Sequence, residues 1–170
     1  MRKGFSMIEL IFVIVILGLL ATVAVPRLTA TRDDAEIAKV TANIQTLLSD
    51  LTTYYTSQGK FSSDISQMTN VPLEIDGNNK KIADMTAAGK KCIKFTLVDF
   101  VTDTGDTKGK PAVIKVEKGA NQNDSLCLKI LGNKGIEKLL NNQFKYINAA
   151  GAEKESEIGE YPVSGLSVAF

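Results

Sequence analysis

The sequence predicts an α+β fold in which a long N-terminal helix packs on a small antiparallel β-sheet. Three observations lead to this prediction. A run without any charged residue extends from Leu10 to Val25. From Ile37 onward, apolar residues recur at spacings of three and four, which is typical of one helix face. After residue 91, segments rich in β-forming residues alternate with turn sequences.

The composition restricts the function classes. The chain of 170 residues has room for one domain plus a segment outside it, and it contains no His and two Cys. Without His, the usual general base and the usual zinc ligand are missing, which weakens most hydrolase and zinc-site interpretations, and no cofactor is expected. The net charge of +1 becomes −1 without Arg2 and Lys3, which gives 18 basic against 19 acidic residues. Bulk charge therefore indicates no nucleic-acid partner.

The N-terminal segment is long enough to cross a membrane. Residues 5–25 are 21 positions, about 31 Å of helix, which matches the hydrocarbon core of a bilayer. Arg2 and Lys3 precede the apolar run and would hold the N-terminus in the cytoplasm by the positive-inside rule. Everything after Pro26 would then lie on the other side.

Glu9 distinguishes three interpretations of this segment. It could be a signal peptide cut after the small residues Thr22 and Ala24, a plain membrane anchor, or a helix retained after cleavage behind Gly4. A carboxylate deep in a bilayer costs about 2.5–3.5 kcal/mol, which the first two interpretations leave unexplained. Cleavage before Phe5 would create a cationic amine about one helical turn from Glu9, on every copy of the chain. The third interpretation is therefore favoured.

The segment RKGFSMIEL, followed by an apolar run that ends in Pro, resembles the N-terminus of type IV prepilins and type II secretion pseudopilins. The resemblance covers about residues 2–40. It implies that a membrane peptidase cuts after Gly4 and methylates the new N-terminus at Phe5. It also implies that Glu9 pairs with the Phe5 amine of an adjacent subunit as a filament grows.

Two further residues take their roles from this resemblance. Gly18 and Pro26 fall where the family has its helix-breaking pair, between which the helix can loosen in filaments. Proline also lacks a backbone donor and crowds the preceding turn, independently of any family.

The function implied is that of a non-enzymatic filament subunit, single-pass in the inner membrane with its globular domain in the periplasm. The subunit is then assembled into a filament in the periplasm or at the cell surface. Implied partners are like and unlike pilin subunits, the prepilin peptidase, an inner-membrane platform and its ATPase. A pseudopilin that supports protein secretion is the preferred interpretation. A competence or adhesive pilin that contacts DNA or a surface, and a plain anchored periplasmic domain, remain alternatives.

The helix is expected to continue beyond the membrane and to end at Gly59, a residue suited to a helix C-terminus. The expected division is a leader at 1–4, a transmembrane and assembly helix at 5–26, an amphipathic half at 27–59 and a β-rich pilin-like domain at 60–170. The apolar face of the amphipathic half comprises Ile37, Val40, Ile44, Leu47, Leu48, Leu51 and Tyr54 or Tyr55.

The downstream sequence predicts the sheet. Strands are expected at Cys92–Val101, Ala112–Gly119 and Ser125–Gly132, separated by turn sequences rich in Gly, Asn and Asp. A short surface helix is expected at 133–142 and a last strand at 163–170. Residues 60–91 are expected to contain one or two helical turns in SSDISQMT and a turn in DGNNKK.

Cys92 and Cys127 both fall in predicted strands. A disulfide between them is expected if the domain lies outside the cytoplasm, and two buried free thiols are the alternative. Cys127 is followed by 43 residues, whereas many type IV pilins close a loop near the C-terminus with their disulfide.

Two sets of charged residues suggest weaker hypotheses, a calcium site and a DNA-binding face. Asp99, Asp103 and Asp106 lie beside Gly105 and could hold calcium, but their spacing does not match an EF-hand, so we expect a solvated turn and no metal. Several lysines could form a DNA-binding face, although interspersed acids and few aromatic residues favour a solvated surface. These are Lys80, Lys81, Lys90, Lys91, Lys108, Lys110, Lys115 and Lys118.

Overall fold

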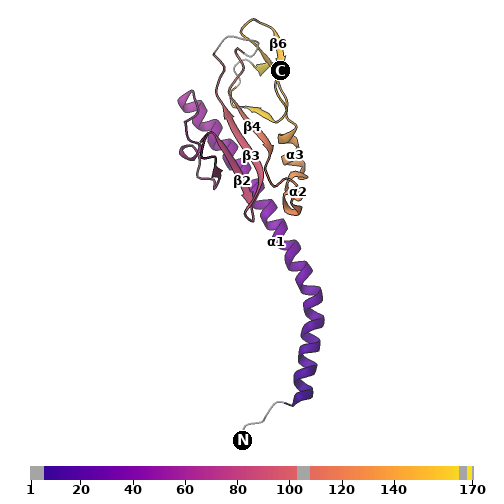
Figure 1. The fold of residues 1–170 in the computed structure, drawn as a ribbon. Coiled ribbons are helices and arrows are strands. Elements are labelled where there is room, and N and C mark those ends of the chain that lie inside the picture. Colours follow the sequence, from indigo (N-terminus) through magenta and orange to yellow (C-terminus); the bar gives the residue numbers. More distant parts are fainter. Residues whose placement is uncertain (1–5, 103–107, 165–167, 170) are drawn as a thin grey trace. The chain divides into compact units, whose positions relative to one another are not determined.

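The computed structural model describes residues 6–102, 108–164 and 168–169 (Figure 1). Two compact units make up the chain, residues 1–36 and residues 37–170. Helix α1 (Met7–Gln58) runs from the first unit into the second. The long N-terminal helix predicted from the sequence is confirmed.

In the second unit, α1 contributes one apolar stripe to the core. Val40, Ile44, Leu47, Leu51 and Tyr55 are buried at spacings of three and four residues, as the sequence predicts. The helix ends where Gly59 adopts a φ of +72°, a conformation that glycine reaches without steric cost. The Gly59 N–H donates to the Tyr55 carbonyl at 2.8 Å. The predicted end of the helix is confirmed.

In the part of the chain that the structure describes, the strands form two antiparallel sheets, one of five strands in the order β1-β2-β3-β4-β7 and one of three in the order β6-β5-β8. Their bounds are β1 Glu74–Ile75, β2 Ile82–Ala87, β3 Lys90–Val98, β4 Val113–Lys118, β5 Lys145–Ile147, β6 Glu153–Glu155, β7 Glu160–Pro162 and β8 Val168–Ala169. The shorter helices are η1 Ile65–Gln67 (3₁₀), α2 Ser125–Leu131 and α3 Lys134–Leu140.

Strand β3 is central to the larger sheet and carries its inner face. Phe95 is paired with Ala83 of β2 and with Val116 of β4, and all three side chains are buried. They belong to the same hydrophobic core as the α1 stripe. Within this unit, Figure 1 shows β2, β3 and β4 lying across α1, with α2 and α3 beside β4. The predicted α+β architecture, a long helix on a small antiparallel sheet, is confirmed.

Several predicted elements are found where the sequence indicates them. The strands expected at Cys92–Val101 and Ala112–Gly119 are β3 and β4, and the helix expected at 133–142 is α3. A single helical turn, η1, lies in the segment SSDISQMT. The last strand, expected at 163–170, is confirmed at Val168–Ala169 and is wrong at residues 163–164, which form a bend; residues 165–167 and 170 lie outside the described residues.

The prediction of a strand at Ser125–Gly132 is wrong, because this segment forms helix α2. Asp124 caps the helix, with its side chain accepting from the Leu126 N–H at 3.0 Å. The buried residues of α2 are Leu126, Cys127, Ile130 and Leu131, which is a helical and not an alternating pattern. A short apolar run fits either structure, and the capping aspartate decides in favour of the helix.

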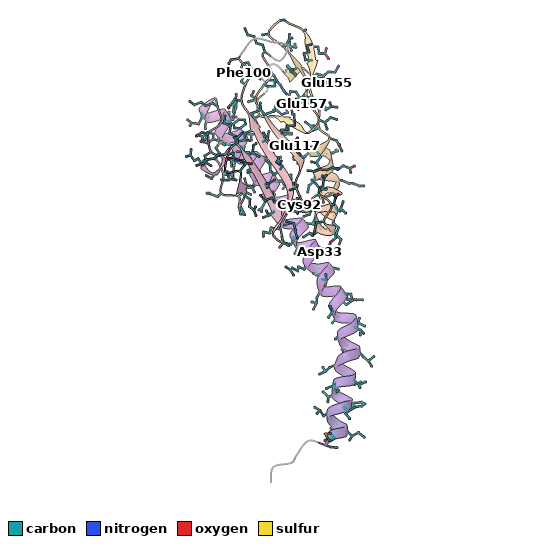
Figure 2. All side chains as sticks on the ribbon, viewed as in Figure 1. Asp33, Cys92, Phe100, Glu117, Glu155 and Glu157 are labelled. Carbon is teal, nitrogen blue, oxygen red and sulfur yellow. A yellow bond between two sulfur atoms is a disulfide. The ribbon has the colours of Figure 1, made fainter. Side chains whose placement is uncertain are left out.

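Cys92 of β3 and Cys127 of α2 form a disulfide, and both residues are buried. The bond joins the sheet to a helix and not to another strand, so the strand assignment of Cys127 needs the same correction. Figure 2 labels Cys92 at the end of β3 that lies near α2.

A buried ion pair links β7 to the loop that precedes β4. The Lys110 ammonium lies 2.7 Å from Oε1 of Glu160, and the side chains are 10% and 3% exposed. The second oxygen of Glu160 accepts from the Glu157 N–H at 3.0 Å, and the Asn142 side chain donates to the Glu160 carbonyl. Both charges are therefore paired and hydrogen-bonded, which burial requires.

Candidate functional site: the N-terminal helix

Helix α1 begins at Met7, and Ser6 occupies the position before it. The Ser6 backbone N–H donates to Oε2 of Glu9 at 2.9 Å. This is one half of a capping box, in which an acid at the third helical position satisfies the N–H of the capping residue. The predicted cleavage and methylation residues, Gly4 and Phe5, lie outside the described residues.

Glu9 therefore has a partner within its own chain, which the sequence analysis did not assign. The S-x-x-E pattern of Ser6 and Glu9 is the sequence signal that could have revealed it. The cap explains why an acid or amide is suited to this position, but glutamine also serves in a capping box. The cap alone therefore does not require the negative charge of Glu9.

The side chains of α1 in the first unit are exposed on every side (Figure 2). Ile8 is 75% exposed, Phe12 68% and Leu28 69%. The helix is long and apolar enough to cross a membrane, judged by its length and composition. Apolar residues all round a helix are expected where its surroundings are themselves apolar, as in a bilayer or a bundle.

The threonine hydroxyls of this segment are satisfied within the helix. The hydroxyl of Thr22 donates to the Leu19 carbonyl at 2.7 Å, and that of Thr29 donates to the Val25 carbonyl at 3.2 Å. An internally bonded hydroxyl can enter an apolar environment without leaving an unpaired donor.

Gly18 and Pro26 both lie inside the continuous helix α1. Nothing lies within 4 Å of the position that a Cβ would take on Gly18. The loosening of the helix between these residues is expected in filaments, and it stays a prediction.

Asp99, considered above as part of a calcium loop, is occupied by protein donors. The Lys81 ammonium bonds Oδ2 of Asp99, and the Phe61 N–H donates to Oδ1 at 3.2 Å. Asp103 and Asp106 lie outside the described residues. Among residues 6–102, 108–164 and 168–169, no group of three or more His, Cys, Asp or Glu is arranged to hold a metal ion.

Many of the lysines considered for a DNA-binding face are paired with acids. Lys115 lies 2.7 Å from Glu157, a residue labelled in Figure 2. This hydrogen bond lowers the pKa of Glu157 and raises the pKa of Lys115. The other pairs are Lys80–Asp64, Lys81–Asp99, Lys91–Glu74, Lys91–Asp84 and Lys110–Glu160. The positive charge of these paired lysines is thereby largely balanced.

Comparison with known proteins agrees with the geometry of the N-terminal segment. Residues 1–25 match the family model of the prokaryotic N-terminal methylation motif. The chain is 37% identical over 60 residues to the type II secretion system core protein G of Klebsiella michiganensis, a match that covers 35% of this chain and 42% of that protein. It is 36% identical over 62 residues to the core protein G of Pectobacterium carotovorum subsp. carotovorum, covering 36% and 40%. No solved structure matches the chain.

These matches span less than half the length of either relative. They agree with the strongest sequence signal, the charged tip followed by Gly, Phe and Glu before an apolar helix. The resemblance to type IV prepilins and type II secretion pseudopilins is confirmed. The chain carries a prepilin-type N-terminal methylation motif and is similar to the core protein G of type II secretion systems.

Proposed function

We propose that this chain is a pseudopilin, a non-enzymatic filament subunit that supports protein secretion. The observation that carries the proposal is a methylation motif joined to an apolar helix whose side chains are exposed on every side. Such a surface needs an apolar environment, first lipid and then the helices of other subunits. A packed domain that stays outside the membrane completes the subunit.

Processing at the N-terminus is the first part of the proposal. The peptidase cuts between Gly4 and Phe5 and methylates Phe5, while residues 5–26 remain as the membrane and assembly helix. Residues 27–59 form the amphipathic half of the helix and residues 60–170 form the globular domain in the periplasm. Gly18 and Pro26 let the helix loosen in the filament.

Assembly is the second part. Glu9 of one subunit pairs with the Phe5 amine of its neighbour, which neutralises two charges that are costly in an apolar environment. Before assembly, the Ser6 N–H holds the Glu9 carboxylate at the start of its own helix. The partners are like and unlike pilin subunits, the prepilin peptidase, and an inner-membrane platform with its ATPase.

The mass of the mature protein tests the processing step. Intact-mass analysis of protein extracted from membranes should give a chain that starts at Phe5 and carries one methyl group. A matched Gly4→Leu variant should keep its leader, because the bulky side chain blocks the cleavage site. A mature start at Met1, or at Val25 after Ala24, would contradict the proposal.

Deletion of the gene tests the use of the filament. If the chain is a secretion pseudopilin, the deletion strain should retain in its periplasm proteins that the parent strain releases. Loss of DNA uptake or surface attachment with normal secretion would instead support the second candidate, a competence or adhesive pilin, which has the same kind of N-terminus.

A further inference from the structure

Two charged residues just beyond the apolar segment have no charged neighbour on their own helix. Arg27 and Asp34 are both exposed. Side chains on a helix interact with residues three and four positions away. For these two residues, those positions hold only uncharged side chains: Val23, Ala24, Ala30, Thr31, Ile37 and Ala38.

Arg32, in the same stretch, differs from this pair. Glu36 lies four positions beyond Arg32, within reach on the same helix. Arg32 is also five residues from Arg27, about 140° around the helix, so it lies on another face. Arg32 and Glu36 are thus placed for a contact within the helix, while Arg27 and Asp34 are placed for contacts outside it.

Arg27 and Asp34 lie on the helix face that carries Glu9. Arg27 follows Glu9 by 18 residues, which is about five turns, and Asp34 follows Arg27 by seven, which is about two turns. α1 is continuous across all three positions in this structure, and Arg27 and Asp34 both follow Pro26, so the proposed loosening between Gly18 and Pro26 leaves their spacing unchanged. In a bundle of parallel copies that present one face in the same direction, residues on that face lie side by side in neighbouring copies.

We propose that Arg27 of one subunit pairs with Asp34 of a neighbouring copy of this chain, displaced along the helix axis by seven residues, about 10.5 Å. The proposal rests on the proposed function, since it places the pair between filament subunits. A neighbour without displacement would bring Arg27 against Arg27 and Asp34 against Asp34, which is unfavourable. The charge order therefore selects a staggered arrangement and disfavours a level one.

The same displacement brings the N-terminal amine to Glu9. We call the copy that supplies Arg27 the upper copy and the copy that supplies Asp34 the lower copy. The displacement sets Met7 of the upper copy level with Ile14 of the lower copy. Glu9 of the lower copy is five residues, about 7.5 Å, below Ile14. Phe5, which carries the amine, is the second residue before Met7. Two residues of extended chain span about 7 Å, which is close to the roughly 7.5 Å that separates this level from Glu9. In both pairs the upper copy supplies the cation and the lower copy the anion. One stagger thus satisfies both pairs.

Charge reversal tests this pair in the full-length chain. Arg27→Asp and Asp34→Arg should each lower the yield of fibres about tenfold, because attraction becomes repulsion at every subunit contact. The double variant should recover most of the yield, since the exchanged charges again attract. As a matched control, Arg32→Asp combined with Asp34→Arg should not recover, because position 32 lies on another face. A double reversal no better than its worse single variant would overturn the pair.

Crosslinking tests the stagger even if the reversed variants insert poorly. Copies with Arg27→Cys and copies with Asp34→Cys, expressed together, should be joined by a short bismaleimide. Copies with Arg27→Cys alone should crosslink much less. Cys92 and Cys127 are bonded to each other, so the introduced thiols are the reactive ones. Equal crosslinking in both cases would overturn the stagger. If wild-type protein keeps its leader and forms no fibre, the proposed function fails; if it assembles normally without this crosslink, only the pair fails.

Discussion

The two units of the chain differ in what covers their apolar side chains. In residues 37–170, Leu47, Leu51 and Phe95 are completely buried by other parts of the same unit. In the first unit, Ile8 and Leu28 remain largely exposed. Burying one such side chain is worth about 1.5–3 kcal/mol. The second unit gains this energy within its own fold. Under the proposed function, the first unit gains it from lipid and from other copies of the chain.

The difference extends to the charged residues. Lys110 and Glu160 are buried in the second unit with their hydrogen-bonding capacity used inside the fold. In the first unit, Glu9 is exposed and bonded to the Ser6 N–H alone among the contacts described. The charges of Lys110 and Glu160 contribute to the stability of the fold, whereas under the proposed function the exposed charge of Glu9 is available for assembly.

The largest effect on folding is expected from breaking the buried ion pair. Glu160→Leu should lower the free energy of unfolding by about 3–5 kcal/mol, because it leaves the Lys110 ammonium buried without a counter-charge. Urea titration of the purified full chain in detergent measures this. The matched control is Glu157→Leu, which removes a surface partner of Lys115 and should cost less than about 1 kcal/mol. Equal losses of unfolding free energy from the two variants would show that burial does not make the Lys110–Glu160 pair more important for stability than the surface pair.

The disulfide should contribute nearly as much. Cys92 and Cys127 are 35 residues apart, and closing a loop of this size is worth about 3–4 kcal/mol in the chain-entropy model. The variant with both cysteines replaced by alanine should unfold at correspondingly lower urea. Thiol labelling of unfolded, unreduced wild-type protein should detect no free cysteine, and two reactive thiols would contradict the bond.

Truncating one leucine in each unit compares how much an apolar side chain of that unit contributes to the free energy of unfolding. Leu51→Ala should lower the free energy of unfolding by about 2–5 kcal/mol, because it leaves a cavity in the core. Leu17, which is 58% exposed, offers the matched truncation in the first unit. Leu17→Ala should leave the urea midpoint unchanged and should instead affect the fibre yield. A large loss of stability from Leu17→Ala would contradict the expectation that Leu17 contributes nothing to the folded core.

A smaller effect concerns acid stability. Hydrogen bonding to Lys115 lowers the pKa of Glu157 below its ordinary value of 4.5. A lowered folded-state pKa stabilises the fold above pH 4.5, and this contribution is lost as the pH falls through the lowered value. The urea midpoint of wild type should therefore fall more steeply in this acid range than that of Lys115→Met. The difference should stay below about 1 kcal/mol, and identical slopes would exclude the pair as a contributor.

The sequence predicted the elements whose signals are long and periodic. α1 combines an apolar run with a stripe from Val40 to Tyr55, and its end at Gly59 follows from backbone sterics. β3 and β4 are rich in β-forming residues and are bounded by turns. Local chemistry determines such elements, so the sequence alone is sufficient to find them.

Most of the missed elements are short, and tertiary contacts decide them; β2, a six-residue strand that was also missed, is the exception. β1, β5 and β7 have two or three residues each, too few for a pattern. Ser125–Leu131 is helical because Asp124 caps it and the core accepts its buried face. The pairing of Lys110 with Glu160 joins residues 50 positions apart, and no local rule connects them. The S-x-x-E pattern of Ser6 and Glu9 also indicates a helix cap, but Glu9 was interpreted only as a charge within an apolar run.

The central claim is that Glu9 is retained for its charge, and one set of variants tests it directly. Fibre yield and membrane abundance would be measured together for Glu9→Gln and Glu9→Leu. Glutamine can keep the cap with Ser6 but cannot neutralise a cationic amine. Both variants should insert as well as wild type or better, since an insertion cost is removed. Both should lose fibres while monomer accumulates in the membrane. Normal fibres from Glu9→Gln would show that Glu9 serves only as a helix cap, and would contradict the account.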